Sequence, residues 1–102
     1  MVTVYHNPNF LSCSFLEGEE LVESVLAQKL SKVADVHTDD LNIAFRQTNT
    51  IDDCWWHNSD VVAVVAHARS TSVGDVLEKD GQAFVVAFCG FEPIPEGAAI
   101  DV

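Results

Sequence analysis

RSTSVGDVLEKDGQAFVVAFCGF, residues Arg69–Phe91, contains the clearest structural signal in this chain. Its Asp80-Gly81 pair separates two apolar runs. A type I′ turn needs positive φ at both central positions, and Asp-Gly between strand-like segments is a strong signal for it. The stretch therefore predicts two hairpin strands, Asp75–Lys79 and Gln82–Phe88, preceded by a hydroxyl-rich loop.

Upstream of the hairpin, the spacing of apolar residues predicts four more elements. Alternating β-rich residues indicate strands, whereas apolar residues three and four apart, with acids early and bases late, indicate helices. In chain order the elements are a strand Val2–Tyr5, a helix Glu19–Leu30, a strand Val33–Thr38 and a helix Asp40–Gln47. Val61–Ala66 fits a buried strand or a short buried helix, and its β-branched residues favour the strand.

Two segments lack a periodic pattern. Phe10, Leu11 and Phe15 surround a polar Ser-Cys-Ser run, which indicates an irregular connector with aromatic anchors in the core. Two prolines and a glycine in Phe91–Gly97 predict the end of regular structure. The whole pattern predicts a single α+β domain over residues 1–95, with a small, mainly antiparallel sheet and about two helices packed on it. Residues 96–102 are expected to form a loose C-terminal tail.

Composition limits the class of protein. With 102 residues and 48% hydrophobic content, the chain suits one domain with a real core. Its three cysteines are an odd number at irregular spacing, which does not suit a disulfide framework. The longest apolar runs are too short to span a bilayer, and no basic segment precedes an apolar one at the N-terminus. These features predict a cytoplasmic protein with no membrane partner.

Charge is the strongest compositional feature. Sixteen acids against five Lys and Arg residues give a formal net charge of −11. Such a chain repels nucleic-acid backbones and attracts basic protein surfaces. Two explanations stay open: solubility, including adaptation to a salty cytoplasm, and a decoy that occupies a basic, nucleic-acid-binding groove. The candidate partner-binding residues are Glu17, Glu19, Glu20, Glu23, Asp35, Asp39, Asp40, Asp52, Asp53, Trp55 and Trp56.

Three constellations bear on chemistry, and none is complete. Cys54 and His57 have a C-x-x-H spacing, but no second pair completes a four-ligand zinc site. His67 with a nearby serine and an acid supplies the residue types for nucleophilic catalysis, yet no nucleophile elbow is present. The Arg69–Gly74 loop fits an anion-binding nest or a hydroxyl-stabilised turn whose arginine pairs with a carboxylate. The sequence therefore predicts no enzyme, no metal and no cofactor.

Several short motifs resemble those of small uncharacterised proteins carried by plasmids and phages. Thr48-Asn49-Thr50-Ile51-Asp52 with a following Trp and Asn58 matches their "TN.ID..W..N" stretch, and Arg69–Val76 matches "RSTSVGDV" before a terminal "GF". The second half is also similar to the "HSLSVSDVV…GF" ending of the YodL-like proteins of mobile elements, from which it departs at Arg69, Thr71 and Gly74. The resemblance implies an origin on a mobile element and no activity. The residues that it singles out are Arg69, Ser70, Thr71, Ser72, Gly74 and Asp75.

Charge and resemblance together predict a small acidic protein of a mobile genetic element that binds a basic surface of a host protein. The most concrete form is a nucleic-acid mimic that inhibits a host CRISPR or restriction complex. The alternative is a structural or regulatory domain that self-associates as a homodimer. In that case Trp55, Trp56 and Phe91 are expected to form an exposed apolar patch.

Overall fold

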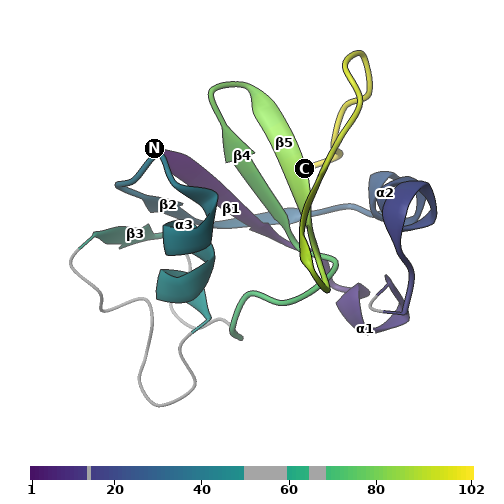
Figure 1. The fold of residues 1–102 in the computed structure, drawn as a ribbon. Coiled ribbons are helices and arrows are strands. Elements are labelled where there is room, and N and C mark those ends of the chain that lie inside the picture. Colours follow the sequence, from purple (N-terminus) through teal and green to yellow (C-terminus); the bar gives the residue numbers. More distant parts are fainter. Residues whose placement is uncertain (14, 50–59, 65–68) are drawn as a thin grey trace.

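The computed structural model describes residues 1–13, 15–49, 60–64 and 69–102 and has the predicted α+β architecture (Figure 1). Among these residues the strands form one six-stranded sheet, and all of its strand pairs are antiparallel. In chain order the elements are β1 (Val2–His6), α1 (Phe10–Cys13), α2 (Gly18–Leu26), β2 (Ser31–Val36), α3 (Leu41–Thr48), β3 (Val61–Ala63), β4 (Val76–Lys79), β5 (Gln82–Ala87) and β6 (Gly90–Pro93).

The predicted hairpin is confirmed as β4 and β5. Lys79 pairs with Gln82 at its closed end, and the ladder runs back to Val76. Asp80 and Gly81 both have positive φ, +51° and +80°, as a two-residue turn of this kind requires. The observed register is the one that a two-residue Asp-Gly turn requires.

The strand order is β3-β2-β1-β4-β5-β6, so β1 lies inside the sheet between β2 and β4. Its sequence alternates as predicted, with Val2 and Val4 fully buried and Thr3 and Tyr5 partly exposed. The strand extends one residue beyond the expected end and includes His6, which is also buried. A two-residue side-chain period therefore places His6 on the same face as the two valines.

The sheet has apolar side chains on both faces, and a different helix covers each. On one face, Leu77 and Val86 join the cluster that contains Ala44 of α3. On the other, Val76 and Val85 join the cluster that contains Leu21 of α2. The helix α3 contacts β1 and β4, whereas α2 contacts β5 and β6, and the two helices lie apart in Figure 1. Each of the strands β4 and β5 thus places a buried apolar side chain on both faces of the sheet.

The first long helix and the strand after it differ from their predicted bounds by more than one residue, whereas α3, β1 and the hairpin strands differ by one residue at one or both ends. The first long helix ends at Leu26, not at Leu30, although Leu30 is buried in the same cluster as the helix. The N–H of Leu30 donates to the Asp101 carbonyl at 2.7 Å, so this residue is held by the C-terminal segment. The next strand is Ser31–Val36, two residues earlier than expected, because its register with β1 pairs Ser31 with His6.

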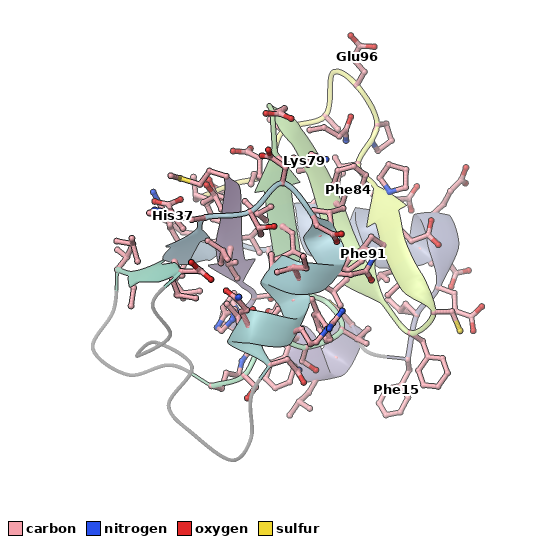
Figure 2. All side chains as sticks on the ribbon, turned by 60° about the vertical axis from the view of Figure 1, so that its left-hand side comes forward. Phe15, His37, Lys79, Phe84, Phe91 and Glu96 are labelled. Carbon is pink, nitrogen blue, oxygen red and sulfur yellow. The ribbon has the colours of Figure 1, made fainter. Side chains whose placement is uncertain are left out.

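The segment after β1 corrects a second expectation. Phe10–Cys13 forms one turn of helix, α1, where an irregular connector was expected. Cys13 is buried, but Leu11 is 68% exposed and Phe15 is 91% exposed. In Figure 2 the Phe15 side chain extends away from the fold. These two residues therefore do not anchor the connector in the core.

The C-terminal region contains a strand that the prolines and glycine did not predict. Gly90–Pro93 forms β6, which pairs with β5 at the edge of the sheet. An edge strand tolerates proline because its N–H would face solvent. Within the expected tail, Asp101 forms a parallel bridge with Lys29.

Two further predictions are confirmed where the structure describes them. The predicted second helix is confirmed as α3, shifted by one residue: Asp40 is its N-cap, because the Asp40 carboxylate accepts hydrogen bonds from the N–H groups of Asn42 and Ile43. Val61–Ala63 forms β3, which agrees with the preference for a strand; residues 65 and 66 of that run lie outside the described residues.

Candidate functional site

The loop singled out by the resemblance contains a fully buried carboxylate, that of Asp75. Arg69 donates to it twice, Nη1 to Oδ2 and Nη2 to Oδ1, both at 2.6 Å. The N–H groups of Asn7 and Ser72 each donate to it at 2.8 Å. The carboxylate therefore ties its own loop to the end of β1.

The guanidinium of Arg69 contacts other parts of the fold as well as Asp75. Its Nη2 also donates to the Asn7 carbonyl at 2.9 Å, and its guanidinium lies 3.6 Å from the centre of the Phe10 ring. This arrangement combines a bidentate ion pair with a cation–π contact. Of the two open interpretations of the loop, the geometry matches the turn whose arginine pairs with a carboxylate.

The same loop is tied to α3 and to β5. The N–H of Thr71 donates to the Thr48 carbonyl at 2.8 Å, and the Asn49 side chain donates to the Thr71 carbonyl. The N–H of Gly74 donates to the Val86 carbonyl at 2.9 Å. Together with the contact of Asp75 to the end of β1, these hydrogen bonds join the loop to α3, β5 and β1.

His6 lies beside this loop. Its Nε2 is 2.9 Å from the Thr71 hydroxyl and 3.9 Å from Oδ2 of Asp75. Burial lowers the pKa of His6 from 6.5 to about 4; the Asp75 charge opposes this change, and the Arg69 charge adds to it. His6 is therefore neutral at neutral pH.

These residues include a histidine, a hydroxyl and a carboxylate, the residue types used in nucleophilic catalysis. The side chains of Thr71 and Asp75, however, are fully buried, so a substrate would have to displace core packing to reach them. We therefore assign the cluster of His6, Asn7, Arg69, Thr71 and Asp75, here called the Asp75 cluster, a structural role. Sequence reasoning chose His67 as the histidine, which lies outside the described residues. The sequence pattern that could have identified His6 is the two-residue alternation of Val2 and Val4, which places His6 on the same buried face of β1.

Gly74 provides a test of how closely this loop packs. Its φ is +95°, and a Cβ there would lie 3.2 Å from the Cβ of Cys13 and 3.3 Å from the Phe10 carbonyl. Gly81 has a similar φ of +80° but open space around it. Gly74→Ala is expected to cost about 1–3 kcal/mol of unfolding free energy more than Gly81→Ala, because only the first adds overpacking to backbone strain. Urea unfolding of both variants measures the difference, and equal losses would contradict close packing at Gly74.

The acids of the first long helix form one group. Glu17 is the N-cap residue of α2, and Glu19, Glu20 and Glu23 follow it; all four are exposed. Within the described part of the chain, none of them makes an ion pair. Acids in the first turn stabilise the helix through its dipole, but this effect does not extend to Glu23. The structure thus brings together four of the predicted partner-binding residues.

The aspartates around α3 do not join that group. Asp35 on β2 accepts from the Thr3 hydroxyl at 2.7 Å and pairs with Lys32 at 3.0 Å. Burial alone would raise its pKa, but these two contacts outweigh that effect and hold the pKa below its usual value. Asp39 pairs with the terminal amino group at 2.7 Å, which lowers its pKa, and Asp40 caps α3. Figure 2 shows His37, near these aspartates, on the opposite side from Phe15.

The remaining predicted residues are only partly accounted for. Phe91 is half-buried, with its ring edge-on to that of Phe45 at 6.4 Å, so it packs on the fold more than it extends an apolar patch. Outside the described residues lie Asp52, Asp53, Cys54, Trp55, Trp56 and His57. Sequence reasoning also missed two exposed aromatic residues: Phe15, expected in the core, and Phe88, expected at the end of a buried strand, which is 86% exposed.

No protein-family model matches this chain, and no curated protein or solved structure is significantly similar to it. Among the described residues, no group of three or more His, Cys, Asp or Glu side chains is placed to hold a metal ion. A helix with the length and hydropathy needed to cross a membrane is likewise not found in residues 1–13, 15–49, 60–64 and 69–102.

Proposed function

We propose that this chain works by binding a basic surface of another protein through the acidic end of α2. The supporting observation is the separation of charge around that helix. Glu17, Glu19, Glu20 and Glu23 are exposed, and Glu92 of β6 lines two hollows beside them. All five Lys and Arg residues of the chain lie in the described ranges, yet none of them lines these hollows. A basic surface would meet this local excess of negative charge without repulsion.

The partner that suits this surface is a nucleic-acid-binding protein in the cytoplasm. Carboxylates compete with phosphates for the same Lys and Arg side chains, so an acidic protein at such a site displaces nucleic acid. The resemblance to proteins of mobile elements supports this proposal, because it implies that the gene comes from a mobile element. In its specific form, the proposal is an inhibitor of a host CRISPR or restriction complex, with no enzymatic activity of its own.

The proposal is tested by DNA cleavage with purified CRISPR and restriction complexes of the host that carries the gene. Wild-type chain is expected to inhibit cleavage by one of them, and prior loading of that complex with DNA is expected to reduce inhibition. Because the contact is electrostatic, inhibition should weaken as salt concentration rises. Full cleavage by every complex at low salt and excess chain would overturn the proposal.

Two variants with the same net charge identify the surface. One carries Glu17→Gln, Glu19→Gln, Glu20→Gln and Glu23→Gln; the other, elsewhere on the surface, carries Asp60→Asn, Asp80→Asn, Glu96→Gln and Asp101→Asn. Each loses four acids, so the formal net charge changes from −11 to −7 in both. The α2 variant is expected to inhibit at least about tenfold more weakly than wild type, because four charge contacts are lost together. The second variant is expected to remain close to wild type.

A further inference from the structure

Three adjoining hollows surround the N-terminal end of α2, and together they form what we call the α2–β6 groove. They lie within residues 15–26 and 87–95 and have volumes of about 550, 130 and 320 Å³. Leu16 and Glu17 line the first two hollows, and Gly18 and Glu92 line the last two. Because neighbouring hollows share these residues, they lie next to one another around the start of α2.

The groove exposes large apolar side chains. Phe15 is 91% exposed and Phe88 is 86% exposed, and each lines a hollow that also contains Leu16 and Glu17. Between α2 and β6, the apolar lining continues with Val22, Leu26 and two prolines. Burying a phenylalanine that was exposed contributes about 1.5–3 kcal/mol. A partner that is attracted by charge alone would leave these apolar side chains exposed.

The rim of the groove selects the occupant. Five glutamates line it, Glu17, Glu19, Glu20, Glu23 and Glu92, and no Lys or Arg does. A second copy of this chain would place the same glutamates against them, and nucleic acid or an anionic membrane would also be repelled. The edge strand β6 is short and contains Pro93, which disfavours pairing with an added strand. After these exclusions, the occupant that suits the groove is a basic protein segment that contacts it through side chains.

We infer that the α2–β6 groove docks a short basic segment of a partner protein through an apolar side chain flanked by Lys or Arg residues. The apolar side chain lies against Phe15 and Phe88, and the flanking bases pair with the glutamates of the rim. This inference rests on the proposed function, because it takes the partner to be basic. It adds that apolar anchoring, and not charge alone, gives the contact its affinity and specificity.

The test is a selection of random short peptides displayed on phage against the immobilised chain, followed by fluorescence anisotropy of the enriched peptides. Enriched peptides are expected to share an apolar residue flanked by Lys or Arg. Oligoarginine of equal length is expected to bind at least about tenfold more weakly, because it lacks the anchor. Enrichment of peptides without this pattern, no enrichment, or equal affinity for oligoarginine would overturn the inference.

Variants locate the binding site. Phe15→Ala with Phe88→Ala is expected to weaken binding of the selected peptides about tenfold or more while leaving the weak binding of oligoarginine unchanged. Leu11→Ala with Val62→Ala, which also removes two exposed apolar side chains, is the matched control and is expected to bind as wild type does. Equal effects of the two double variants would overturn the inference.

Three other outcomes are distinguishable. A dimer by light scattering that dissociates in the Phe15→Ala, Phe88→Ala variant would show that a second copy occupies the groove, and would overturn the inference. If host DNA cleavage is inhibited but the selected peptides bind no better than oligoarginine, the proposed function is supported and apolar anchoring in the groove is excluded. If the selected peptides bind in the groove but no complex is inhibited, the groove is supported as a peptide-binding site and the inhibitory function is excluded.

Discussion

Asp75→Ala is expected to destabilise the fold by about 3–5 kcal/mol, because it removes one partner of a buried ion pair. The lost carboxylate leaves the Arg69 guanidinium and the N–H groups of Asn7 and Ser72 without their acceptor. It also releases the loop from β1. Urea unfolding followed by circular dichroism measures the change, and Glu96→Ala, at an exposed position, is the control.

A double-mutant cycle separates the ion pair from general loss of packing. Arg69→Ala alone leaves the Asp75 carboxylate buried with its charge uncompensated, so it is also expected to be strongly destabilising. The double variant Arg69→Ala, Asp75→Ala is expected to lose about 0.5–3 kcal/mol less than the two single losses added together. Additive losses, or an Asp75→Ala variant as stable as Glu96→Ala, would contradict the role assigned to the Asp75 cluster.

The second large effect is a loss of stability in mild acid. The pKa of His6 is about 4 in the folded chain and close to 6.5 when the chain unfolds, because the folded site is buried. Between these values the unfolded state binds the proton more readily, so the free energy of unfolding falls as pH falls. The contribution is fully present above about pH 6.5, and about 3 kcal/mol is lost on reaching about pH 4.

His6→Gln is the control for this pH dependence. Glutamine has no titrating group and can still hydrogen-bond to the Thr71 hydroxyl, so the variant is expected to show a flatter stability profile over the same pH range. The contacts of Asp35 and Asp39 hold the pKa of each carboxyl below its usual value, so their contribution to stability is lost only as pH falls below the ordinary aspartate range. The contribution of His6 starts to be lost at higher pH, because the pKa of its unfolded state is close to 6.5. Equal slopes for His6→Gln and wild type above about pH 4 would contradict a buried neutral His6.

The sequence predicts best what adjacent residues determine. The Asp80-Gly81 turn, the Asp40 cap and the Val2-x-Val4 alternation each act within a few residues, and all three appear in the structure. The residues after α2 follow a different rule: the helix ends at Leu26, and the N–H of Leu30 donates to the carbonyl of Asp101, 71 positions away. Local periodicity cannot reveal such a contact, because Leu30 is buried whether or not it is helical.

Non-local contacts also explain what the sequence missed in the candidate sites. Of the acids near the N-terminus of the chain, Glu17 to Glu23 stay together because they share one helix end, whereas β2 carries Asp35 and the following aspartates across the sheet. His6 and Thr71 meet although they are 65 positions apart. Because Phe15 and Phe88 are apolar, the sequence predicts that both are buried. The fold shows that both are exposed.

Whether the glutamates of α2 bind a basic partner, as we propose, is tested by the affinities of the two equal-charge variants for the inhibited host complex. The affinity of Glu17→Gln, Glu19→Gln, Glu20→Gln, Glu23→Gln for that complex is expected to fall at least about tenfold. The affinity of Asp60→Asn, Asp80→Asn, Glu96→Gln, Asp101→Asn is expected to stay near that of wild type. Equal affinities of the two variants would show that net charge, and not the surface at α2, attracts the partner, and would contradict the claim.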